Sequence, residues 1–290
     1  MRETSISYNM NTPKINNFLY YVLYPAHIVA LMGIFVFPFY FDFGLKQILL
    51  LFAGWILLAG FGSAVTLHRI VSHRALELRQ GIKPVALWVA SLCLQGSPLG
   101  WAAIHRGSHH RFSDTERDAH TPNKGKLYAY HMWLHDWGTY FNPKYAIDLI
   151  KDPMHVFFAH NYVKIILISY LIIGLLDWQV LLFMFIIPAV YSLHQESAVN
   201  VLCHLKNQGY RNFETKDDSN NRPIMAKLVW GQAWHNNHHA KASSYDFGTS
   251  VSGRKDEFDP SLLFVPLIAT KASREKIFKA RKDAMANSNT

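Results

Sequence analysis

Four long apolar runs constrain the fold of this chain more than any other feature of its sequence. A bilayer core needs about 20 apolar residues in helical conformation, and four segments reach or approach that length: 17–41, 46–66, 162–176 and 178–197. Residues 42–45 join the first two runs, and Asp177 alone joins the last two. The sequence therefore predicts an all-α integral membrane protein with four transmembrane helices in two hairpins.

The distribution of positive charge predicts the orientation in the membrane. The chain carries 29 Lys and Arg residues against 20 Asp and Glu, a net charge of +9. Nearly all of the basic residues lie before the first hairpin, between the hairpins or after the second. By the positive-inside rule these parts, with both termini, face the cytoplasm. No basic helix interleaved with aromatic residues indicates nucleic-acid binding.

We expect a single domain over residues 1–290. The segments 67–161 and 198–270 would form a helical cap on the cytoplasmic side, followed by a basic tail at 271–290. The apolar stretch 84–101 is shorter than a span before its Gly and Pro residues begin, so we expect a buried or interfacial helix that does not cross. The first run is too long for a signal peptide and is expected to remain as a membrane anchor.

Histidines are clustered near the ends of these runs. Nine of the 16 histidines fall into four short patterns, one of which also contains an asparagine. The clustered residues are His68 and His73; His105, His109 and His110; Asn200 and His204; and His235, His238 and His239. Such ionisable clusters at a membrane edge indicate function.

The spacing predicts which of these side chains point together. On an α-helix, residues three or four apart share a face. The three histidines of the last cluster should therefore point the same way, as should His105 and His109, with His110 about 100° further round. His68 and His73 are about 140° apart on a straight helix. They would converge only where the helix end is kinked or unwound.

The remaining histidines do not form such patterns. A lone histidine is more often a surface or core residue than a ligand, and we expect this of His27, His155, His160 and His194. His131 and His135 are four residues apart, and we favour a structural or substrate-cavity role for them over a ligand pair.

The clustered histidines indicate metal binding. Neutral imidazole is a good ligand for iron, zinc, copper and nickel, whereas structural zinc sites close with four ligands that usually include cysteine. Nine histidines suffice for two metals with four or five ligands each, and Asn200 would complete one shell through a water molecule. Ligating histidines donate their other N–H to a carboxylate or carbonyl. We assign that supporting role to Asp114, Asp118, Gln232 and Asn236.

These motifs resemble those of the membrane-bound fatty acid desaturases, in particular the stearoyl-CoA (delta-9) type and its bacterial acyl-lipid relatives. The resemblance runs from about Gly62 to Pro260 and rests on three histidine boxes in this order, with Asn200-Val-Leu-Cys-His204 between the second and third. It implies a mushroom-like fold whose cap holds two iron ions on the nine clustered histidines. O2 would be the co-substrate, and a hydrophobic tunnel would hold a long acyl chain carried by CoA or by a lipid.

The sequence departs from the delta-9 pattern at three places. Three residues separate His105 from His109 where two are usual, and Gln232 stands where glutamate is frequent. The segment 130–137 also differs from the region that usually follows the second box. These differences concern the tunnel and the delta-9 selectivity rather than the metal ligands.

Desaturation of this kind needs two electrons per turnover from outside the chain. No flavin fingerprint and no His-Pro-Gly-Gly haem signature is present in the sequence. We therefore expect a ferredoxin, a rubredoxin or a cytochrome b5-like protein as the donor. The basic segment 271–282 is expected to contact the anionic lipid surface, with docking of such a donor or of a CoA phosphate as alternatives.

Two other functions use similar residues. A membrane diiron hydroxylase or ketolase would have the same histidine boxes and would give an oxygenated lipid. A bis-histidine haem protein or a non-catalytic metal-binding membrane protein belongs to a different class. Haem ligands would face each other inside the spans, whereas the clusters of this chain lie beyond the ends of the apolar runs.

Overall fold

The computed structural model describes residues 18–287, and this part of the chain is built from helices. Its β-structure is limited to isolated bridges, such as the one between Leu78 and Ala269. The all-α prediction is therefore correct for the described residues. The first residue of the predicted span 17–41 lies outside them, as do the last three residues of the tail.

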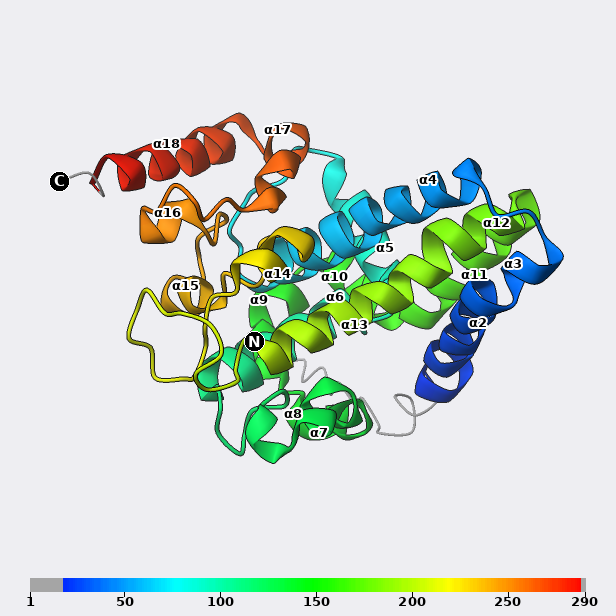
Figure 1. Cartoon of the computed structure of the whole chain (residues 1–290), viewed down its shortest axis with the longest axis horizontal. Helices are drawn as coiled ribbons and strands as arrows, with labels where there is room; N and C mark the ends of the chain where they lie inside the picture. Colours follow the sequence, from blue (N-terminus) through cyan, green and yellow to red (C-terminus); the bar gives the residue numbers. More distant parts are fainter. Residues whose placement is uncertain (1–17, 288–290) are drawn as a thin grey trace, which may run out of the picture.

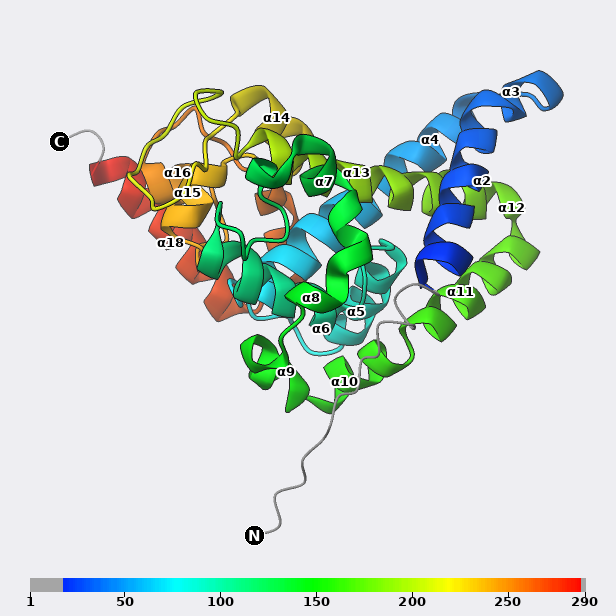
Figure 2. The same ribbon diagram turned by 90° about the horizontal axis from the view of Figure 1, so that it is seen from below.

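The apolar runs form two helical hairpins that lie side by side (Figures 1 and 2). The first arm comprises a π-helical turn and two helices, and the second arm is one continuous helix with a π-helical second half. The elements of the first hairpin are η1 Leu19–Leu23, α2 Tyr24–Phe35, α3 Phe37–Tyr40, α4 Leu45–Gly54 and η2 Trp55–Ser72. Those of the second are α11 Tyr162–Leu176, α12 Trp178–Val180, η7 Leu181–Ile186 and α13 Ile187–Leu202.

Two of these helices, Leu45–Ser72 and Trp178–Leu202, are long and apolar enough to cross a membrane. A third qualifies if α10 (Pro153–His160) and α11 are taken as one span bent by 70°. Leu19–Phe35 is a shorter apolar helix. The predicted run 162–176 coincides with α11, whereas the second and fourth runs continue past 66 and 197 to carry histidine-cluster residues on their ends.

The two hairpins pack closely where small residues meet backbone. A side chain on Gly54 would come within 2.4 Å of the carbonyl oxygen of Met184. Only glycine therefore allows the second helix to approach the fourth this closely, as is typical of helix pairs in membranes. Gly54 and Met184 lie in the halves of the two helices that are remote from the cap, so this close approach holds the hairpins together there.

The apolar stretch 84–101 does not form one long helix. It contains α5 (Ile82–Leu92) and the start of α6 (Pro98–Ile104), separated by a turn in which Leu94 and Gly96 have positive φ. This agrees with the expectation that the stretch is buried without crossing, since α5 alone is too short to span.

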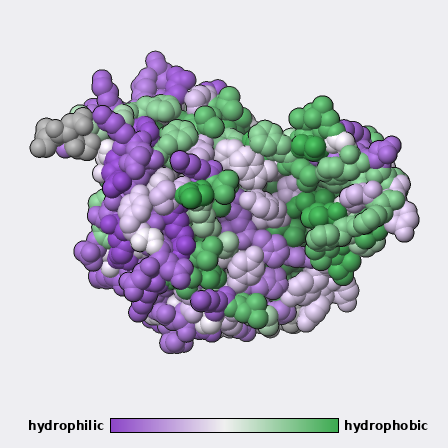
Figure 3. Space-filling model, in the orientation of Figure 1, coloured by the Kyte–Doolittle hydropathy of each residue, from purple (hydrophilic) through white to green (hydrophobic). Residues whose placement is uncertain are grey.

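The remaining helices, all short except the last, gather at one end of the hairpins (Figure 2). They are η3 His105–His110, η4 Pro122–Lys124, α7 Lys126–Tyr130, η5 Met132–Asp136, α8 Trp137–Tyr140, η6 Pro143–Ala146, α9 Ile147–Ile150, α14 Pro223–Leu228, α15 His235–Ala240, α16 Thr249–Ser252, η8 Pro260–Phe264, α17 Val265–Ile268 and α18 Lys271–Asn287. Figure 3 shows apolar surface over the hairpin end and polar surface over this other end. The molecule therefore has an apolar part and a polar part, which we call the cap.

Candidate metal centre

Four segments bring the clustered histidines together at the junction of the hairpins and the cap. His68 lies near the end of η2, which His73 follows directly, and His204 follows the end of α13. The other two segments are η3, which carries the second cluster, and α15, which carries the last. Six of the nine histidines are buried, while His73, His110 and His239 are half-buried.

π-Helical winding decides which histidines meet. In a π-helix the hydrogen bond runs between residues five apart, as from the N–H of His73 to the carbonyl of His68 (3.2 Å). The rings of these two residues are 5.2 Å apart. The structure therefore has the unwound helix end that we expected to be necessary for His68 and His73 to converge. In η3, likewise, the Nε2 atoms of His105 and His110 are 3.1 Å apart.

The nine histidines form two groups, and within each group the ligand atoms lie within 4.8 Å of one another. The five-histidine group contains His68, His73, His105, His110 and His238, and the four-histidine group contains His109, His204, His235 and His239. The α-helical expectation was therefore wrong for the second and last clusters. His109 is separated from His105 because η3 is π-helical, and His238 is separated from its two neighbours on α15.

In the four-histidine group, the Nδ1 atom of every ring faces a hydrogen-bond acceptor. Nδ1 of His204 lies 2.9 Å from a carboxylate oxygen of Asp114. His239 makes the corresponding contact with Asp217 at 2.8 Å, and His109 contacts both oxygens of Asp118 at 3.3 Å. His235 faces the backbone carbonyl of Gln232 at 3.1 Å. Each acceptor requires a proton on Nδ1, so each Nε2 presents its lone pair.

These lone pairs converge on a common point. The Nε2 atom of His235 lies 3.0 Å from that of His204 and 3.1 Å from that of His239. Ligands about 2.1 Å from a metal ion would have neighbouring nitrogens about 3.0 to 3.4 Å apart. Four unshared electron pairs in such contact repel one another unless a cation lies between them. The donor set therefore fits a metal ion.

The five-histidine group has a similar spacing but less support behind its rings. The Nε2 atoms of His68 and His238 are 2.8 Å apart, and those of His73 and His105 are 2.9 Å apart. Nδ1 of His68 contacts the side-chain oxygen of Gln232 at 2.7 Å. Nδ1 of His238 is buried without a partner among the described residues. Imidazole nitrogens alone suit iron, zinc, copper or nickel, so this group also fits a metal.

Burial keeps most of these rings neutral, as metal binding requires. It lowers the pKa of His238 well below the ordinary value, and burial followed by the charge of Arg106 lowers the pKa of His73 to about 3. His204 differs, because the hydrogen bond and charge of Asp114 outweigh its burial and raise its pKa.

Gln232 connects the five-histidine group to a buried acid. Its amide N–H donates to Glu196, which also accepts a hydrogen bond from Ser63 at 2.7 Å. Asn236, by contrast, has no hydrogen bond to a clustered histidine side chain among the described residues. Its oxygen accepts from the backbone N–H groups of residues 212 and 213, so it holds that loop against α15.

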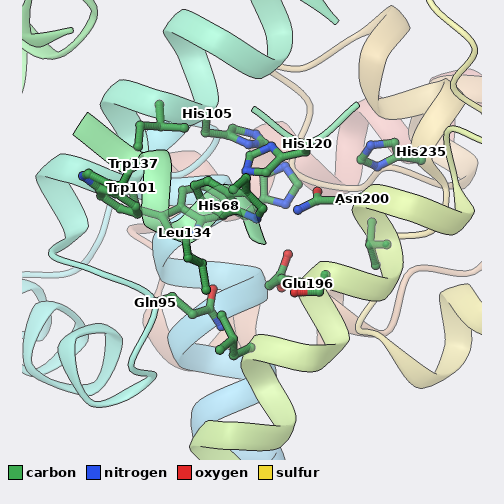
Figure 4. Close-up of a pocket in the computed structure, with 15 residues that line it drawn as sticks. His68, Gln95, Trp101, His105, His120, Leu134, Trp137, Glu196, Asn200 and His235 are labelled. Atoms are coloured by element: carbon green, nitrogen blue, oxygen red, sulfur yellow. The ribbon is translucent and has the colours of Figure 1, made fainter. Parts of the chain in front are cut away.

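A narrow cavity lies beside both groups (Figure 4). Figure 4 shows Asn200 and Glu196 projecting into it from α13, while His68 and His235 border it from other elements. The rest of its lining is largely apolar: Trp101, Ile104, Trp133, Leu134, Trp137, Leu193 and Val199. Asn200 thus borders the same space as the ligand nitrogens, as its predicted water-mediated contact would require.

Three residues of the site were missed from the sequence. Glu196 carried a usable signal, since an acid inside an apolar run marks function. His120 lines the cavity, and its buried Nδ1 has no hydrogen-bond partner among the described residues. Asp217 supports His239 from 22 positions away, and nothing in its local sequence distinguishes it from an exposed turn.

Apart from His120, whose ring lies 5.3 Å from that of His109, several unclustered histidines contact one another or tyrosines instead of the two groups. Nε2 of His27 is 3.2 Å from Nε2 of His194, and Nδ1 of His194 contacts the hydroxyl of Tyr130 at 3.0 Å. The exposed His135 contacts the hydroxyl of Tyr24 at 2.7 Å. The His27–His194 contact joins the two hairpins, and the contacts to Tyr130 and His135 join the hairpins to the cap.

Comparison with known proteins agrees with the geometry. The model of the fatty acid desaturase family matches residues 46–244. Delta-9 acyl-lipid desaturase 2 of Arabidopsis thaliana is 29% identical over 226 residues, 76% of this chain and 70% of that protein. The sn-1 stearoyl-lipid 9-desaturase of Synechocystis sp. is 27% identical over 269 residues, 90% of this chain and 80% of that protein. Icosanoyl-CoA 5-desaturase of Limnanthes douglasii is 32% identical over 239 residues, 77% of this chain and 62% of that protein.

The matched segment contains both histidine groups, the cavity beside them and, except for Leu45, the two helices long enough to cross a membrane. The chain therefore belongs to the fatty acid desaturase family and is a membrane oxidoreductase of lipid metabolism.

Proposed function

We propose that this protein desaturates a long fatty acyl chain with O2 at two iron ions held by the nine clustered histidines. The observation that carries the proposal is the narrow cavity, because it brings an apolar lining up to both histidine groups. The printed names of the relatives include acyl-lipid and acyl-CoA desaturases, so both carriers are candidates. Delta-9 is the proposed position, as in two of the three relatives named above.

The chemistry explains why metal ions are needed. The methylenes of an acyl chain have no acidic proton, so acid–base catalysis cannot begin the reaction. The balanced change is –CH2–CH2– + O2 + 2 electrons + 2 H⁺ → –CH=CH– + 2 H2O. Iron ions bound to the two groups would supply the activation of O2 and the removal of both hydrogens. One ion would take the five-histidine group, and the other would take the four-histidine group with Asn200 through water.

The protein's own residues position the chain and exclude water. Trp101 stacks on His105 with ring centroids 4.5 Å apart, and Trp133 packs against His120 at 4.3 Å. A second cavity, of about 420 Å³, shares Leu134 and Trp137 with the first and extends to α11. We assign the reacting carbons to the first cavity and the rest of the acyl chain to the second.

The proposed membrane placement has four spans and a single domain. Leu19–Phe35 and the bent α10–α11 pair would join the two long helices in the bilayer. The cap, the metal centre and both termini would lie on the cytoplasmic side, where the basic residues gather. An external one-electron carrier would then reach the centre from the cytoplasm.

The test is expression in a host that lacks its own desaturase. Fatty acid methyl esters are compared by gas chromatography–mass spectrometry, with His238→Ala and His235→Ala beside the wild type. We expect a new monounsaturated acid that disappears in both variants, and two irons per chain in the wild-type protein. Hydroxylated or ketone products would replace the proposal with an oxygenase, and a Soret band in the absorption spectrum would replace it with a haem protein.

A further inference from the structure

The polar surface around the metal centre is not covered evenly. His73, His110 and His239 are the three clustered histidines that are half-buried. An exposed cation follows each within two residues: Arg74, Arg111 and Lys241. Basic residues therefore flank the clustered residues that are least buried, although the side chain of His239 is itself only 2% exposed.

A surface hollow of about 610 Å³ lies at His73. His73 itself lines it, together with Arg74, Arg106 and Lys144. The Nε2 atom of His73 lies 2.9 Å from that of His105 on its inner side. A partner seated in the hollow would thus lie against His73, which is itself a member of the five-histidine group.

Tyr145 ties the hollow to the second histidine cluster. Its ring packs on Gly107 so closely that a side chain there would come within 2.1 Å of it. The ammonium of Lys144 lies 5.0 Å from the ring centroid, and the guanidinium of Arg111 lies 5.7 Å from it. These two cations therefore flank one aromatic ring that is fixed against the metal-binding segment.

The hollow carries an excess of positive charge. Among the described residues, Arg74, Arg106 and Lys144 line it with a single carboxylate, that of Asp148, which pairs with Arg106 at 2.7 Å and with Arg74 at 2.8 Å. Within residues 18–287, no ion pair joins a carboxylate to Arg111, Lys144 or Lys241. We call these three residues with Arg74 the basic rim.

We propose that the basic rim is the docking surface of a small acidic protein that carries one electron at a time. This inference rests on the proposed function, because it supplies the two electrons in the balanced reaction by two successive dockings. Complementary charge steers such transient partners and fixes their orientation. The hollow does not suit the acyl chain, which has its own apolar cavity on the other side of His68 and His105.

The basic helix α18 is a poorer location for this partner. In Figure 1, α16 lies between α18 and the histidine-bearing α15. Lys276 and Lys279 are exposed on α18, and neither lines the hollow at His73. They provide a matched control, because reversing two lysines changes the net charge equally at either location.

Binding is measured first, on protein loaded with zinc so that no turnover occurs. The probes are a plant-type [2Fe–2S] ferredoxin and the soluble haem domain of cytochrome b5, both acidic, with the protein in lipid nanodiscs. Lys144→Glu with Lys241→Glu should weaken binding by about 10-fold at low salt and flatten its salt dependence. Lys276→Glu with Lys279→Glu should leave it within about twofold of the wild type.

A turnover assay then distinguishes a failure of the docking proposal from a failure of the proposed function. Iron-loaded protein is reduced either with dithionite or with the carrier, and product is measured after addition of O2 and acyl substrate. The rim variant should form as much product as the wild type with dithionite and should be about 10-fold slower with the carrier. Absence of product from the wild type with dithionite would count against the proposed function alone.

Other outcomes would overturn the docking proposal. Unchanged carrier binding in the rim variant, or a loss confined to the α18 variant, would move the partner elsewhere. Failure of both carriers to bind the wild type would reject an acidic partner. A raised KM for acyl-CoA with unchanged carrier binding would make the hollow a site for the CoA phosphates instead.

Discussion

The two histidine groups use the same side chain but are supported in different ways. In the four-histidine group, three rings face carboxylates, those of Asp114, Asp118 and Asp217. Among the described residues, no carboxylate contacts a ring of the five-histidine group, where His68 faces the neutral amide of Gln232. One group is therefore supported by charge and the other is not.

The five-histidine group is supported by packing instead. The ring of Phe247 lies 4.1 Å from that of His238, and its backbone N–H donates to Asp259. Asp259 in turn forms a fully buried ion pair with Arg69, at 2.9 Å. Arg69 is the residue after His68, so this ion pair fixes the helix end and the aromatic ring together.

The difference has a consequence for the metals. A carboxylate that accepts a hydrogen bond from a ligating histidine raises the basicity of the ring and fixes its orientation, and three carboxylates carry enough negative charge to balance a divalent or trivalent metal ion. We therefore expect the four-histidine group to hold its metal more tightly, and the five-histidine group to lose its metal first to a chelator.

The largest expected effect comes from removing the ion pair near the five-histidine group. Asp259→Ala leaves the guanidinium of Arg69 buried and unpaired, which costs about 3–5 kcal/mol. The free energy of unfolding, followed by tryptophan fluorescence in detergent micelles, should fall by that amount. Asp256→Ala breaks only the exposed pair with Arg254 and should change it by less than about 0.5 kcal/mol. Equal effects of both variants would contradict the idea that packing and this ion pair support the group.

A smaller effect is expected from the carboxylates of the other group. Asp217→Asn keeps an acceptor for His239 but removes the negative charge, so metal affinity at the four-histidine group should fall by about 10- to 100-fold. Competition with a chelator measures this, with Mössbauer spectra to distinguish the two irons. Asp218→Asn is the control, because its side chain reaches only the exposed Lys206, at 3.6 Å. A loss of metal affinity at the five-histidine group instead would contradict the idea that carboxylates support the four-histidine group.

The sequence was sufficient to predict the all-α architecture and which nine histidines gather in the structure, but not how these histidines are grouped. Apolar runs of the length of a span are a strong signal, and α11 begins and ends where its run does. The grouping failed for the second cluster because it was placed at α-helical intervals, whereas His105 and His110 meet through a π-helical turn. It failed for the last cluster because the two groups lie on either side of α15, so that neighbouring residues of one helix belong to different groups. Nothing in the local sequence announces that change of winding.

The supporting residues divide in the same way. Asp114 and Asp118 follow the second cluster closely in sequence, and both face histidine rings. Asn236 was placed with them by its position beside His235, yet its amide holds a loop instead. Asp217 reaches its histidine only through the folded chain. Closeness in sequence therefore predicts which carboxylate accepts a hydrogen bond from a histidine where a tight turn follows that histidine. It does not predict such contacts between residues of different helices or loops.

The smallest expected effect concerns how charge reaches the five-histidine group. Glu196 lies behind Gln232, which faces His68, so the carboxylate is one amide away from the ring. Exchanging the two residues, in Glu196→Gln with Gln232→Glu, would place the carboxylate directly on His68 and let the new amide donate to it. The affinity of the five-histidine group should remain within about threefold of the wild type in this double variant.

Each single substitution should lower the metal affinity of the five-histidine group more than the double substitution does. Gln232→Glu alone puts two buried carboxylates in contact, and Glu196→Gln alone removes the one carboxylate of this pair. We therefore expect each single variant to lose metal affinity by about 3- to 10-fold. The coupling free energy between the two positions should be about 0.5–3 kcal/mol. Cobalt-substituted protein reports this through its d–d absorption bands as well as its affinity. The bands should shift in the single variants and shift back in the double variant, because the orientation of His68 sets the ligand field. Additive losses would mean that Glu196 and Gln232 act independently, and the five-histidine group would then lack even this indirect support from charge.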